Sequence, residues 1–62
     1  MTSDQEIHTL LTARRFGGYF HSKLAEAGLA AHPRSRLIIF AHFPQLAKQF
    51  GPGSRFYSEA LG

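Results

Sequence analysis

The chain has 62 residues and no cysteine, and its seven Lys and Arg against four Asp and Glu give a net charge of +3. This length suffices for one domain, over residues 1–62, and the lack of cysteine excludes disulfides and thiolate metal sites. Hydrophobic residues make up 44% and charged residues 18%, which excludes a disordered tail and leaves apolar surface for a partner.

No segment approaches the roughly 20 apolar residues that span a bilayer. The first eight residues, MTSDQEIH, are polar and acidic, unlike a secretory signal or a transit peptide. We therefore expect a cytoplasmic protein that does not enter a membrane.

The first predicted element is one long helix over residues 4–27. Ser3 is its expected N-cap, with Glu6 completing a capping box, and Gly28 is its expected stop. Apolar and small residues recur at intervals of three and four, which predicts a face buried in the core. That face consists of Leu10, Ala13, Gly17, Phe20, Leu24 and Ala27.

A second line of side chains runs beside this face, and we predict that it contacts a partner protein. It is apolar at one end and small or cationic at the other, and so short a chain has little with which to cover it. Its members are Ile7, Leu11, Arg14, Gly18, His21 and Ala25.

The stretch RRFGGYF, residues 14–20, has the composition of a nucleic-acid-binding loop. In the ribonucleoprotein-type signature, however, the glycine and aromatic residues stand at other positions than they do here, and that signature requires a β-sheet. We interpret the stretch as helical, although two glycines within a helix cost about 1 kcal/mol each relative to alanine. Another helix is therefore expected to cross closely at Gly17, and Arg15 is expected to contact the partner.

A second helix is predicted over residues 33–42, with Pro33 in its first turn and His32 as a capping residue. Its segment RLIIF, residues 36–40, is apolar nearly all round, which favours a position in the centre or against a partner. An intermolecular strand is the alternative for this segment.

Two more short helices complete the predicted all-α fold. Pro44 suits the start of a helix over residues 44–50 that stops at Gly51, and Ser54 suits the cap of a last helix over residues 54–61.

The last predicted helix begins with a cationic and aromatic cluster. Aromatic residues and arginine are enriched in the hot spots of protein interfaces. We therefore predict that Arg55, Phe56 and Tyr57 anchor a partner.

Nothing in the sequence indicates catalysis or a cofactor. The four carboxylates, at positions 4, 6, 26 and 59, form no visible acid and base pair. None of the four histidines has the i, i+4 spacing of a helical zinc pair. The expectation is a protein that is not an enzyme and holds no metal or cofactor.

We interpret the chain as a protein-interaction module, a small regulator, inhibitor or subunit that binds a larger protein. The first alternative is a nucleic-acid-binding protein, and the second is a structural homo-oligomer such as a homodimer. In the first alternative, phosphate contacts come from Arg14, Arg15, Lys23, Arg34 and Arg36.

Overall fold

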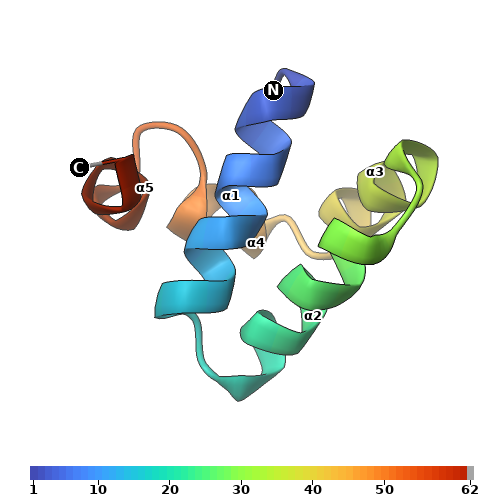
Figure 1. Cartoon of the computed structure of the whole chain (residues 1–62), viewed down its shortest axis with the longest axis horizontal. Helices are drawn as coiled ribbons and strands as arrows, with labels where there is room; N and C mark the ends of the chain where they lie inside the picture. Colours follow the sequence, from blue (N-terminus) through green and yellow to red (C-terminus); the bar gives the residue numbers. More distant parts are fainter. Residues whose placement is uncertain (62) are drawn as a thin grey trace.

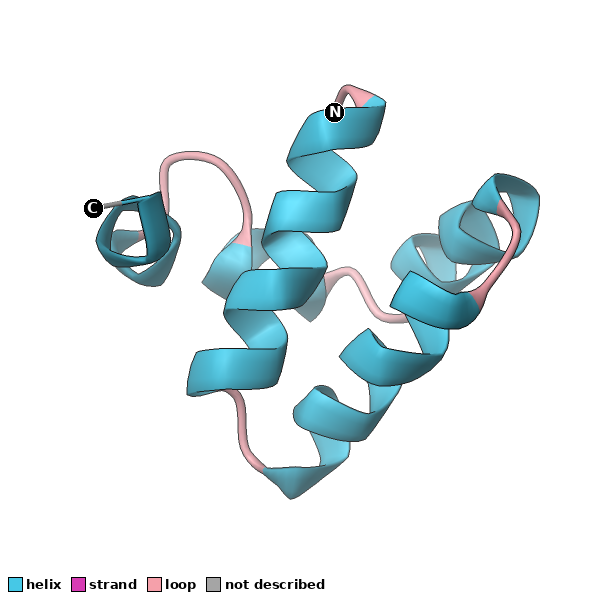
Figure 2. Ribbon diagram, in the orientation of Figure 1, coloured by secondary structure: helices cyan, strands magenta, loops and turns pink. Residues whose placement is uncertain are grey.

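The computed structural model describes residues 1–61, which form helices joined by short loops and contain no strand (Figure 2). The predicted all-α fold class is confirmed. The five helices are α1 (Ser3–Phe16), α2 (Tyr19–Ala30), α3 (Pro33–His42), α4 (Gln45–Phe50) and α5 (Arg55–Leu61).

Helix α1 lies in the middle of the molecule, with the other helices arranged around it (Figure 1). It contacts α2 on one side and α5 on the other, and α4 crosses behind it in this view. Helix α3 packs mainly against α2 and therefore lies at the outside of the molecule.

The prediction of one continuous helix over residues 4–27 is wrong, because the chain breaks at Gly17 and Gly18. Both glycines are extended, with ψ values of 159° and −178°. The N–H of Gly17 donates to the carbonyl oxygen of Ala13 at 2.8 Å and ends α1. A Cβ atom at Gly17 would lie 2.5 Å from that same oxygen, so a larger residue there must displace the backbone.

The break lets α2 fold back beside α1 (Figure 1). The two helices approach closely at Gly28, where a Cβ atom would lie 3.0 Å from Cδ1 of Leu10. Gly28 is therefore a packing position inside α2, which continues to Ala30, and the prediction that Gly28 ends a helix is wrong. The close helix crossing expected at Gly17 occurs at Gly28.

The core is small and draws on α1, α2 and α4. Its buried members are Leu10, Ala13, Ala25, Leu46 and Phe50. Of the core face predicted for a continuous helix, the α1 residues Leu10 and Ala13 are buried, whereas Phe20 is 56% exposed. Ala27 is also exposed. The break gives α2 its own orientation, so the periodicity of α1 does not carry over into it.

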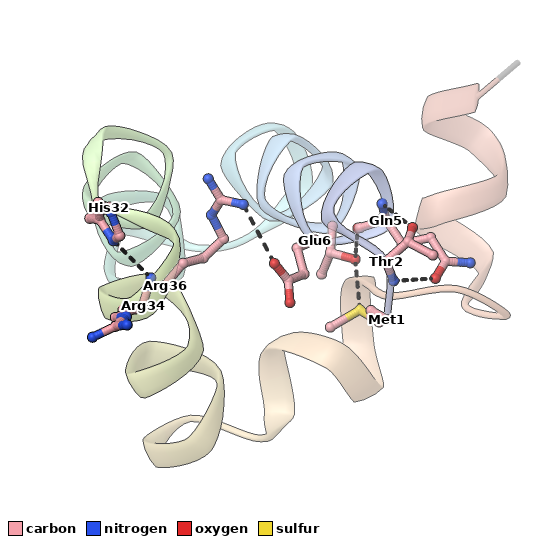
Figure 3. A network of polar contacts seen from close by, with 8 residues as sticks. Met1, Thr2, Gln5, Glu6, His32, Arg34 and Arg36 are labelled. Carbon is pink, nitrogen blue, oxygen red and sulfur yellow. Dashed lines mark hydrogen bonds and ion pairs between the residues drawn. The ribbon is translucent and has the colours of Figure 1, made fainter.

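The cap of α1 lies one residue earlier than predicted. Thr2, not Ser3, is the N-cap: its Oγ1 accepts the N–H of Gln5 at 3.1 Å, and Oε1 of Gln5 accepts the N–H of Thr2 at 2.9 Å (Figure 3). Gln5 thus takes the capping-box role expected of Glu6, and the Glu6 carboxylate turns toward α3.

Helix α3 has the predicted bounds, and the alternative of a strand for residues 36–40 is wrong. Nδ1 of His32 accepts the N–H of Arg34 at 3.2 Å, which caps the helix as expected (Figure 3). The helix is not central, however, since Leu37 is 56% and Ile38 59% exposed.

The last two helices begin close to the predicted positions. Helix α4 starts at Gln45, with Pro44 as its N-cap instead of its first residue. Helix α5 starts at Arg55, and Oγ of Ser54 accepts the N–H of Tyr57 at 3.2 Å, which is the predicted cap.

A buried ion pair ties α3 to α1. The Nη1 atom of Arg36 donates to Oε1 of Glu6 at 3.5 Å (Figure 3), and the two side chains are only 8% and 11% exposed. Because an uncompensated charge is costly in such a place, each partner depends on the other.

We expect Gly17→Ala to lower the free energy of unfolding by about 1–3 kcal/mol, because its Cβ meets the Ala13 carbonyl group. Gly18→Ala is the matched control, since no atom lies within 4 Å of a Cβ there. It should change the stability by less than about 1 kcal/mol, as the loss of an N-cap glycine and the stiffer unfolded chain oppose each other. Urea unfolding followed by circular dichroism measures both; equal losses would contradict the role given to Gly17.

We expect Arg36→Met to lower the free energy of unfolding by about 3 kcal/mol or more, because it leaves the buried carboxylate of Glu6 without a partner. The double change Glu6→Met and Arg36→Met should recover most of that loss. The same urea measurement tests this pair, and a double variant as unstable as the single one would show that the ion pair is not the cause.

Candidate functional site

More large apolar side chains lie on the surface than in the core. Leu10, Leu46 and Phe50 are buried, whereas nine such side chains are exposed. Apolar groups left in water are the usual mark of an interaction surface when they lie together. The nine are Met1, Ile7, Leu11, Tyr19, Phe20, Leu37, Ile38, Phe56 and Leu61.

Two of these side chains and two arginines form a continuous surface on α1. Ile7 and Leu11 are 38% and 37% exposed, and Arg14 and Arg15, in the last turn, are also exposed. At 3.6 residues per turn the four residues share one side of the helix, opposite the buried Thr9. We call Ile7, Leu11, Arg14 and Arg15 the outer face of α1.

Arg15 is held in place by an aromatic stack. Its guanidinium carbon lies 4.8 Å from the ring centroid of Phe16. That ring stacks on Phe56 of α5, with centroids 5.0 Å apart and an interplanar angle of 25°. A guanidinium group over a ring keeps the N–H donors at its edge available, so Arg15 can still bind a carboxylate through two hydrogen bonds.

The aromatic stack continues through the core. Phe56 contacts Phe50 at 6.0 Å, and Phe50 contacts His21 at the same centroid distance. His21 in turn contacts Phe20 at 5.4 Å, and Phe20 contacts Phe43 at 5.7 Å. Since Phe50 is only 4% exposed, the surface ring of Phe56 is anchored to buried structure.

Within residues 1–61, three cations are neutralised by ion pairs. Each forms an ion pair with a glutamate, at distances of 3.2–3.5 Å. The pairs are Lys23 with Glu26, Arg36 with Glu6 and Arg55 with Glu59.

The remaining charges leave the outer face cationic. Of the seven Lys and Arg, three are paired, so four have no ion-pair partner among residues 1–61. Both arginines of the outer face belong to these four, with Arg34 on α3 and Lys48 on α4. Asp4 is the remaining carboxylate, and it lies in the first turn of α1, where the helix dipole stabilises it.

The structure brings together only part of the predicted partner-contacting line. Ile7, Leu11 and Arg14 lie on the outer face, and Gly18 is exposed in the turn that follows it. His21 is partly buried within the aromatic stack. Ala25 is fully buried in the core, so the prediction that Ala25 contacts a partner is wrong, because α2 turns this residue inward.

The predicted anchor at the C-terminus packs against α1. The ring of Tyr57 meets that of His8 edge to face at 4.5 Å, and Phe56 stacks on Phe16. Phe56 remains 39% exposed. Arg55 is exposed beside it and pairs with Glu59.

The five cations predicted to contact phosphate do not form one surface. Arg14 and Arg15 are adjacent on α1, whereas Arg34 lies on α3 and Lys23 pairs with Glu26 on α2. Arg36 is buried against Glu6, which removes it from the predicted phosphate contacts.

Two exposed aromatic residues at the turn between α1 and α2 were not predicted as surface residues with a binding role. Tyr19 is 83% and Phe20 56% exposed. Both follow directly after the glycine pair, and a helix break at those glycines is the signal that places them on the surface.

No protein-family model matches the chain, and neither a curated protein nor a solved structure matches it. Within residues 1–61, no three His, Asp or Glu side chains are grouped to hold a metal ion, and no pocket is found. None of the described helices combines the length and apolar character needed to cross a membrane.

Proposed function

We propose that this protein is an interaction module that binds a larger protein through the outer face of α1. The observation that carries the proposal is the composition of that face: two partly exposed aliphatic side chains are followed along α1 by two arginines that have no ion-pair partner among residues 1–61. Aliphatic contact area beside arginine, with aromatic side chains next to it, is typical of the centre of a protein interface.

The shape of the face fits a common mode of recognition. Ile7, Leu11 and Arg14 follow one another at intervals of four and three on an exposed helix side, which is the spacing with which a helix contacts a partner groove or a second helix. The partly exposed Phe56, stacked on the Phe16 ring that Arg15 contacts, adds aromatic area beside the arginine end.

Nucleic-acid binding is less well supported by the same residues. Two unpaired arginines on one face give a dependence of log K on log salt of only about −1.8, at 0.9 for each phosphate. A protein that makes about 6–10 phosphate contacts has a salt dependence roughly three to five times steeper. The aliphatic half of the face has no role in such contacts, whereas it contributes directly to a protein interface.

The role that follows from these features is that of a small regulator, inhibitor or subunit. A chain of 62 residues that covers part of a larger protein can block the access of another molecule or complete an assembly. The proposal rests on the surface alone and requires no catalytic group.

We expect Leu11→Asp to abolish capture of the protein partner by the tagged chain from a lysate of its native host, with nuclease present. A charge in the middle of an apolar contact is unpaired and costs about 2 kcal/mol or more. Leu37→Asp is the matched control, because it places the same charge on another exposed leucine, on α3.

The two variants show whether the partner binds the outer face of α1 or the exposed side of α3. Captured bands lost with Leu11→Asp and kept with Leu37→Asp would support the outer face. Loss with Leu37→Asp alone would place the interface on α3 and contradict the proposal. Bands that disappear on nuclease treatment of the unmodified chain would favour nucleic-acid binding instead.

A further inference from the structure

We infer that the outer face of α1 binds an acidic segment of its partner, in which apolar side chains contact Ile7 and Leu11 and carboxylates pair with Arg14 and Arg15. The inference rests on the proposed function and names the chemistry of the partner at that same face.

The distribution of charge along α1 supports this assignment. Asp4 lies ten residues before Arg14, which is about 15 Å along a helix, so it does not neutralise the arginine end. Glu6 is buried against Arg36. The two arginines therefore meet no carboxylate within residues 1–61, and a partner gains most by supplying one.

The spacing of the face specifies the order of groups in the partner segment. Leu11 lies one turn before Arg15 and Ile7 lies two turns before it, at about 6 Å for every four residues. A matching segment thus carries its apolar side chains one to two turns from its carboxylates. An amphipathic acidic helix has this arrangement.

The side chain of Arg15 is pre-organised for an ion pair with a partner carboxylate. The ring of Phe16, itself stacked on Phe56, restrains the guanidinium group, which lowers the side-chain entropy that binding would remove. The donors at the edge of the group remain free for a bidentate pair with a carboxylate. Lys23, by contrast, contacts the ring of Tyr19 but already pairs with Glu26.

The charges also argue against a second copy of this chain as the occupant. Within residues 1–61 a second copy offers Asp4 as its carboxylate outside an ion pair, but presents four cations outside such pairs. Two copies whose α1 helices meet in parallel at this face bring arginines against arginines, which like-charge repulsion opposes. In an antiparallel pair the two arginines of each copy meet only Asp4 of the other, so one carboxylate faces two cations.

The test is photo-crosslinking in cells of the native host, with p-benzoylphenylalanine in place of Leu11 in the full chain and mass spectrometry of the adduct. The same reagent in place of Leu37 serves as the reference position. The expected adduct at position 11 is a peptide of another protein with clustered Asp or Glu residues next to apolar ones.

Charge variants test the arginines themselves. Arg14→Gln with Arg15→Gln should lower the yield of this adduct about tenfold or more, because charge-assisted hydrogen bonds are lost. Arg34→Gln with Lys48→Gln removes the same charge elsewhere and should leave the yield within about twofold, since distant exposed charges are screened. Circular dichroism confirms that both pairs of variants fold.

The remaining outcomes overturn the inference in distinguishable ways. A protein adduct without clustered carboxylates, or one whose yield both charge variants lower equally, refutes the acidic segment and leaves the proposed function intact. An adduct with this same chain identifies a second copy, and an adduct with nucleotides identifies nucleic acid. No adduct at position 11 above the reference position refutes the proposed function as well.

Discussion

The fold depends on the chain reversal at Gly17 and Gly18. It turns what would be one helix into two that pack against each other, with Gly28 lying on Leu10. The core residues Leu10, Ala13 and Ala25 come together only because of this reversal. It also decides which side of α1 is covered, so the exposure of Ile7, Leu11 and the two arginines follows from the same turn.

The small size of the chain explains the balance between core and surface. So few residues enclose little volume, and packing of the helices is supplemented by the buried pair of Glu6 and Arg36 and by the aromatic stack. The stack serves two purposes, since it fastens α5 to the core and positions Arg15 at the surface. The stability of the fold and the composition of the outer face are therefore linked through Phe16.

Local signals in the sequence predict the second half of the chain well. Pro33 and His32 mark the start of α3, and Ser54 marks the start of α5, because caps act within a few residues of the helix end. The shared exposed side of Ile7, Leu11 and Arg14 was also predicted, because they lie within one helix, where spacing alone determines the shared side. Their contact with a partner stays a prediction.

The sequence-based predictions are wrong where residues distant in sequence interact. The intervals of three and four continue through Gly17 and Gly18, so periodicity predicts an unbroken helix and places Phe20 inside and Ala25 outside. The pairing of Glu6 with Arg36 joins residues 30 positions apart, and no local pattern specifies it. This ion pair forms only when α1 and α3 pack against each other.

The most direct test of this account is a nuclear Overhauser measurement between the methyl groups of Leu10 and the α-protons of Gly28. The reversal at the glycine pair predicts a strong cross-peak, because a Cβ atom built on Gly28 would lie only 3.0 and 3.1 Å from the two Leu10 methyl carbons. In one continuous helix the two residues would be about 27 Å apart. Absence of the cross-peak, together with helical contacts running unbroken through Gly17 and Gly18, would contradict the fold and the outer face derived from it.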